Sequence, residues 1–227
     1  MLPSLLCVIA LADFDIQKHI YPLSKPIPAP EITIDVAAAP DLKEWAESAK
    51  SLATEWYPRL TELLSTTGWK SPKKLNFVFR EKQDAPAYCT GREISYSIAW
   101  VRAHPDDLGM VVHELTHVVQ NYPSNKVDTG WLVEGIADYV RWWRYEPESP
   151  RSRINFEKAS YKDAYRTTAA WLAYVSQKYD RRLVPMLDAA LRKGDDPMPI
   201  FTSQTGKSAD DLWLEFKESK WAAAFRN

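Results

Sequence analysis

The spacing of hydrophobic residues changes near residue 106, and this change constrains the fold more than any other feature of the sequence. Before it, most apolar residues fall in short runs that alternate with polar residues or are rich in aromatic and β-branched side chains, as strands are. After it, apolar residues recur every three or four positions, as they do along helices. Strands followed by helices are typical of the α+β class. We therefore expect a mixed sheet in the first half of the chain and a helical second half.

The expected elements follow from these patterns. We expect strands at 31–36, 75–79, 87–90 and 93–97, the last two forming a hairpin around Gly91. A long helix at 41–64 separates the first two strands. The later helices are expected at 107–122, 130–145, 159–179, 181–192 and 208–219. The last of these begins with the capping signature Ser208-Ala209-Asp210-Asp211.

The N-terminal residues are interpreted separately from the domain. Residues 1–12 contain an apolar run that ends in Ala10-Leu11-Ala12, which resembles the cleavage site of an export signal. No Lys or Arg precedes the run, so we interpret it as a truncated signal; the alternative is a strand or helix that belongs to the domain. Residues 13–30 form a Pro-rich extension, and residues 31–227 a single domain. A signal would place the protein outside the cell or in the periplasm.

Composition excludes several functions. Lys and Arg (29) nearly balance Asp and Glu (30), and no basic stripe suggests a nucleic-acid partner. Two cysteines do not make a disulfide framework. Beyond the N-terminal run, no segment has the length of a membrane span. We expect a monomer.

The sequence His113-Glu114-Leu115-Thr116-His117 is an H-E-x-x-H motif, and the apolar stripe around it predicts a helix. On a helix the two histidines lie one turn apart on the same face and can bind one metal ion. Glu114 is rotated away from them and could act on a water molecule as a general base. The alternative is an exposed helix face with an ordinary surface Glu.

A catalytic zinc ion needs a third protein ligand. Glu134 and Asp138 lie one turn apart on the polar face of the next expected helix. This spacing resembles that of gluzincin peptidases, in which the Glu binds zinc and the Asp orients a zinc-bound histidine. We assign Glu134 as the third ligand and Asp138 to the outer shell; the reverse assignment and a pair of exposed acids stay open.

These motifs together resemble the basic secretory protein family of plants and bacteria, on the runs 113–120 and 132–141. Similarity at 87–94, 165–172 and 206–213 extends it across residues 31–219. The resemblance implies a secreted zinc peptidase with a zincin-like fold that acts on a peptide or protein substrate. The family is linked with plant defence, but this chain, with a net charge of −1, is not basic.

Zincin peptidases also bind the substrate backbone along an edge strand, and we expect residues 93–97 to be that strand. An oxyanion donor is expected on the helix that follows Glu134, where Tyr161 and Tyr165 lie one turn apart; we choose Tyr165. Two alternatives remain: a binding or defence protein that has the fold without turnover, and a purely structural metal site.

Overall fold

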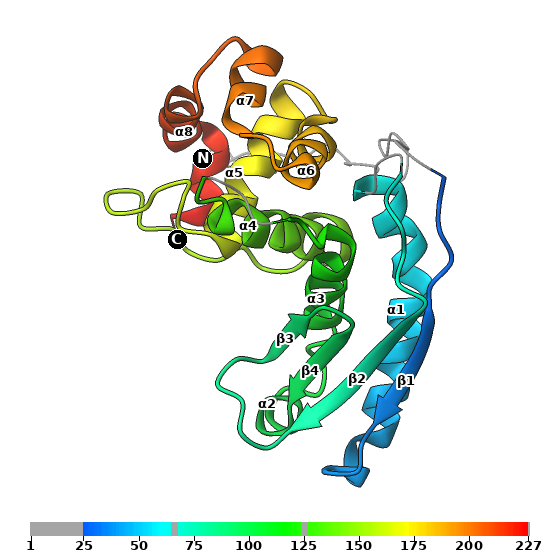
Figure 1. Cartoon of the computed structure of the whole chain (residues 1–227). Coiled ribbons are helices and arrows are strands. Elements are labelled where there is room, and N and C mark those ends of the chain that lie inside the picture. The colour runs from blue at the N-terminus through cyan, green and yellow to red at the C-terminus, as the bar shows by residue number, and fades with distance from the viewer. Residues whose placement is uncertain (1–24, 65–67, 124–126, 227) are drawn as a thin grey trace, which may run out of the picture.

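A small sheet forms one half of the molecule and a group of helices forms the other (Figure 1). The computed structural model describes residues 25–64, 68–123 and 127–226. The predicted export signal at 1–12 and most of the Pro-rich extension lie outside these ranges. The expected α+β class is confirmed.

The sheet has four strands in the order β1-β2-β4-β3. Strands β1 (Glu31–Asp35), β2 (Lys74–Arg80) and β4 (Glu93–Ser97) are parallel, and β3 (Ala87–Thr90) runs antiparallel to β4. The predicted hairpin is present, and Gly91 turns it with a φ of 62°. The prediction that residues 93–97 form an edge strand is wrong. Strand β4 pairs on both sides, with β2 and β3, so β3 is the edge.

Helix α1 (Lys43–Leu64) packs against the sheet, after a 3₁₀ turn at Pro40–Leu42. Alternate residues of β2 are buried, as the period of a strand predicts. The ring of Trp45 on α1 meets those of Phe79 and Tyr96 edge-on, at centroid distances of 5.9 and 5.1 Å. These contacts fix the sheet against the helix.

The second half is helical, as expected. It begins with the short α2 (Ile98–Ala103), which the sequence did not predict, and continues into α3 (Gly109–Gln120) and α4 (Gly130–Val140). A π-helical turn, η3 (Arg141–Tyr145), extends α4. The remaining helices are α5 (Tyr165–Lys178), α6 (Leu183–Lys193), the unpredicted α7 (Met198–Thr205), α8 (Ala209–Glu218) and the 3₁₀ turn η4 (Lys220–Phe225). Ser208 caps α8 as predicted, because its Oγ accepts from Asp211 N at 3.1 Å.

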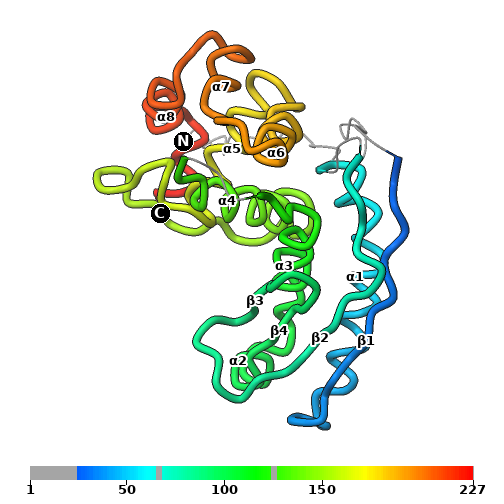
Figure 2. Tube along the Cα trace, in the orientation of Figure 1, coloured from blue at the N-terminus to red at the C-terminus, as the bar shows by residue number. Residues whose placement is uncertain are grey.

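Helix α3 connects the two halves (Figure 2). It packs against α1 and β3 on the sheet side and against α4 on the helical side. Helices α4 and α5 in turn approach closely at Gly135. A Cβ added there would lie 2.6 Å from Thr168 Cβ and closer still to its Cγ2. Only glycine fits this contact without displacing α5.

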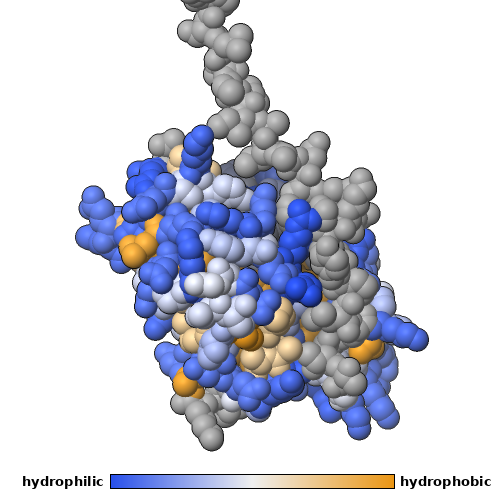
Figure 3. Space-filling model, turned by 90° about the horizontal axis from the view of Figure 1, so that it is seen from above, coloured by the Kyte–Doolittle hydropathy of each residue, from blue (hydrophilic) through white to orange (hydrophobic). Residues whose placement is uncertain are grey.

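Hydrophilic residues dominate the face seen in Figure 3, and hydrophobic ones form small patches between them. Within the described ranges, no helix is both long and apolar enough to cross a membrane. The large hydrophobic side chains that are exposed in the same ranges are Tyr88, Val127, Tyr165 and Leu214. Two of them, Tyr88 and Tyr165, line the main cavity.

Candidate metal centre

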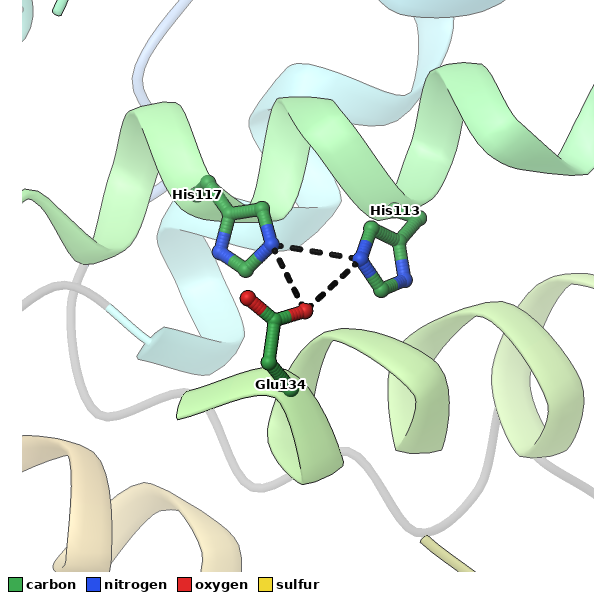
Figure 4. A group of neighbouring side chains, drawn as sticks. All are labelled: His113, His117 and Glu134. Atoms are coloured by element: carbon green, nitrogen blue, oxygen red, sulfur yellow. Dashed lines mark hydrogen bonds and ion pairs between the residues drawn. The ribbon is translucent and has the colours of Figure 1, made fainter. Parts of the chain in front are cut away.

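Helices α3 and α4 bring three potential ligands to one point. His113 and His117 project from α3, and Glu134 projects toward them from α4 (Figure 4). His113 Nε2 lies 3.2 Å from His117 Nε2. Glu134 Oε2 lies 3.3 Å from the first nitrogen and 3.4 Å from the second. The three residues are therefore close enough to bind one metal ion.

The other ring nitrogen of each histidine has its own partner. His113 Nδ1 lies 2.8 Å from Asp138 Oδ1, and His117 Nδ1 lies 2.7 Å from Gln120 Oε1. Gln120 Nε2 donates to the carbonyl of Val133, so its Oε1 is the atom that accepts. Both Nδ1 atoms therefore carry hydrogen and donate. When an imidazole held in this way is neutral, its Nε2 lone pair points at the shared point, as the lone pair of a metal ligand must.

The charges at this point are coupled. Burial disfavours charge on His113, but hydrogen bonds with Asp138 and Glu134 outweigh it and raise the pKa of His113 to about 10. Burial also acts to raise the pKa of Glu134, yet hydrogen bonds with the two histidines lower it to about 2. The triangle thus favours one positive charge at its centre. A proton supplies that charge on His113, and a divalent cation could replace the proton.

Glu114 lies beside the triangle without joining it. The side chain is buried, and burial raises the pKa of Glu114, although the nearby His113 and His117 act to lower it. The backbone N–H of Cys89 donates to this carboxylate, so β3 helps to hold it. A buried carboxylate with a raised pKa next to a cation site is suited to accept and release a proton.

The three ligands and Glu114 line a cavity of about 960 Å³. Part of its wall is the edge strand β3, through Ala87, Tyr88 and Cys89. Helix α5 contributes Tyr165, whose ring is nearly parallel to that of His113 at a centroid distance of 6.2 Å.

The backbone at Tyr165 is strained. Ala164 and Tyr165 have φ values of 63° and 44°, and left-handed backbone is costly for residues other than glycine. Such strain at a cavity wall is often associated with function. Here it places an exposed tyrosine next to the histidine pair.

Tyr161 does not share this position. It lies in the turn before α5, so the two tyrosines are not one turn apart on a single helix, as the sequence suggested. Its ring is buried against Trp131 and Trp171, at centroid distances of 5.3 and 4.7 Å. Tyr161 is a core residue, and only Tyr165 faces the cavity.

Sequence reasoning missed two residues that position the site. Gln120 lies three residues after His117, a spacing that places both on one helix face and could have suggested the contact. Arg192 of α6 donates to the carbonyls of Val119 and Gln120 at 3.0 and 2.9 Å. It therefore caps the end of α3, and no sequence pattern indicates that long-range contact.

These features define a class: an α+β protein with a helix-borne H-E-x-x-H site that can hold a metal ion. A family model described as "Peptidase of plants and bacteria" matches residues 48–216. The chain belongs to this family, as its sequence resemblance predicted. Searches of curated proteins and of solved structures gave no significant match.

Proposed function

We propose that the protein is a zinc-dependent peptidase with a zincin-like fold. One observation carries the proposal: His113 Nε2, His117 Nε2 and Glu134 Oε2 converge at 3.2–3.4 Å while both Nδ1 atoms are engaged elsewhere. Membership of a family described as peptidases supports the reaction class. The assignment of each residue to a role remains part of the proposal.

The ligand set fits zinc. Tetrahedral zinc with bonds of about 2.0–2.1 Å keeps neighbouring ligand atoms about 3.3–3.4 Å apart, close to the edges of this triangle. Two imidazoles and one carboxylate, with no thiolate, are typical of a catalytic site that leaves one position open. Zinc held there would polarise the scissile carbonyl and lower the pKa of its bound water toward neutrality.

Glu114 is the proposed general base. Its carboxylate would take a proton from the attacking water and later deliver that proton to the leaving amine. The N–H of Cys89 fixes the carboxylate, and burial raises its pKa toward the range where proton exchange is efficient. Asp138 would hold the ring of His113 in the correct orientation.

The cavity wall suggests how a peptide would bind. Within the part of the chain that the structure describes, β3 pairs only with β4, so its outer edge offers backbone groups to an extended chain. This edge replaces residues 93–97 as the proposed site of backbone pairing. Tyr165 lies on the α5 side of the same cavity, where its hydroxyl is the proposed donor to the oxyanion of the tetrahedral intermediate.

The test is Glu114→Gln, which preserves shape and removes the base. We expect unchanged zinc content and a fall in casein hydrolysis of about 10²–10⁴-fold. Glu55→Gln, at an exposed ion pair on α1, is the matched control and should behave as wild type. Wild-type hydrolysis by Glu114→Gln would refute the role of Glu114. A zinc-loaded wild-type protein that cleaves no peptide would favour a binding protein without turnover.

A further inference from the structure

Two arginines contribute to the wall of the cavity. Arg153, from the loop before α5, and Arg166, from the first turn of α5, are both exposed and both line the cavity wall. Arg166 directly follows Tyr165, so it lies next to the proposed oxyanion donor.

Trp142 holds Arg166 in place. The guanidinium carbon of Arg166 lies 4.0 Å from the centroid of the Trp142 ring, and its Nη1 donates to Ser152 Oγ at 2.6 Å. Trp142 belongs to the π-helical turn η3, a distortion that is frequent at functional sites. A stacked guanidinium has fewer conformations to lose when it binds a ligand.

Arg141 also stacks on Trp142, but unlike Arg166 it is paired with carboxylates. The guanidinium carbon of Arg141 lies 4.3 Å from the Trp142 ring centroid, but this arginine is paired with Asp107 at 2.5 Å and Glu146 at 3.5 Å. Arg166 has no such carboxylate partner within 4.0 Å among the residues that the structure describes.

Arg153 likewise has no carboxylate partner within 4.0 Å among the described residues. The acids near these arginines are engaged elsewhere. Asp163 Oδ2, on the same cavity wall, accepts from Ser160 N at 2.9 Å, and Glu146, which acts on Arg166 at longer range, is paired with Arg141 at 3.5 Å. Among the described residues, neither Arg166 nor Arg153 is therefore directly paired with a carboxylate.

We propose that Arg166 and Arg153 form a carboxylate subsite that selects peptides with an acidic side chain or a free C-terminus near the scissile bond. The inference rests on the proposed peptidase function and names its substrate preference. A planar guanidinium can bind a carboxylate through two parallel hydrogen bonds, which makes arginine well suited to this recognition.

Binding tests the subsite without requiring turnover. In the Glu114→Gln protein, calorimetry would compare two peptides that differ only in Glu or Gln at one position, each position being scanned in turn. We expect at least one position where the Glu peptide binds about 10-fold more tightly. Arg166→Gln should abolish that difference, and Arg153→Gln should reduce it. Arg59→Gln, at an exposed arginine of α1, should leave it unchanged.

A second arm separates the two sources of carboxylate. The same peptides would be compared with free and amidated C-termini, and a preference for the free acid that is lost in Arg166→Gln assigns the subsite to the C-terminus. For the wild-type enzyme, kcat/KM should follow the same order as affinity. Equal binding of all matched peptides would overturn the subsite, even if the enzyme cleaves them. If the wild-type protein binds the peptides selectively but cleaves none of them, the proposed peptidase function is overturned instead.

Discussion

Gly135→Ala would test whether the contact between α4 and α5 positions Glu134, the proposed metal ligand. The new Cβ would lie 2.6 Å from Thr168 Cβ, whereas ordinary contacts begin at 3.4 Å. Rotation of the Thr168 side chain moves its Cγ2 but not its Cβ. The two helices must therefore separate by most of an ångström.

The expected magnitude follows from two opposing terms. Overpacking of a tight core costs about 1–3 kcal/mol, while replacing a mid-helix glycine by alanine gains about 0.8–1.0 kcal/mol. Because Cβ and Cγ2 of Thr168 both block the new atom, the cost should lie near its upper limit. We expect a net loss of about 1–2 kcal/mol, which for a chain of this size lowers Tm by about 2–8 °C. Movement of α4 also displaces Glu134, so zinc affinity should fall by about 10-fold or more.

The assay combines thermal unfolding of the metal-free protein with zinc competition against a chelator. Gly130→Ala is the control in the same helix, because its Cβ would meet its nearest neighbour, Asp128 Oδ1, at an ordinary 3.6 Å. The double variant Gly135→Ala with Thr168→Gly removes the blocking Cβ and Cγ2, so it should restore zinc affinity but not full stability. If Gly135→Ala matches Gly130→Ala in both measurements, the reasoning from this contact is refuted.

Three further predictions concern other parts of the molecule. Glu134→Ala should lower zinc content after dialysis far more than Asp138→Ala, whose loss should cost about 10–100-fold in affinity; the reverse order would make Asp138 the ligand. Tyr165→Phe should lower kcat and kcat/KM together by about 10²–10³-fold with little change in KM. Tyr161→Phe should affect only stability, and unchanged kinetics in both variants would refute Tyr165 as the oxyanion donor. Burial acts to raise the pKa of Glu215, but hydrogen bonds from Lys207 and Lys178 outweigh it and lower the pKa from 4.5 to about 2. The ionised carboxylate therefore stabilises the fold above pH 4.5, and this stabilisation is lost as pH falls through 2. Glu215→Gln should therefore lower the free energy of unfolding at pH 7 by only about 1 kcal/mol, since the lysines are partly exposed. The difference from wild type should vanish near pH 2, and a difference that stays constant with pH would contradict this link between the pKa and stability.

The helical half and most strands were predictable because their signals are local. The alternation in β2 predicts burial on one face of the strand, and the structure shows that pattern. The apolar stripe around His113 predicts a helix, which is present, although α3 is buried on nearly all sides. The proximity of His113 and His117 follows from helix geometry alone. The position of Glu134 next to the two histidines does not follow from helix geometry alone, because it depends on how α4 packs against α3.

Features that depend on distant segments were not predictable in this way. Strand order is one: β4 is internal because β2 pairs with it, and the pairing joins residues far apart in the chain. The late start of α5 is another, because the strained backbone at Ala164 depends on the surrounding packing and not on local propensity. The separation of Tyr161 from Tyr165 follows from the same backbone turn.

The potential ligands lie close together in the sequence as well as in space. His113 and Glu134 are 21 positions apart, and Asp138, which supports His113, is 25 positions from it. A metal ion would therefore close one short loop of chain, and closing a short loop restricts little of the unfolded ensemble. The three potential ligands all lie within that loop, so the ion itself would not link the loop to the sheet or to the helices after α4. Chelation should thus free the α3–α4 hairpin, seen as faster amide hydrogen exchange there, while the sheet keeps its protection.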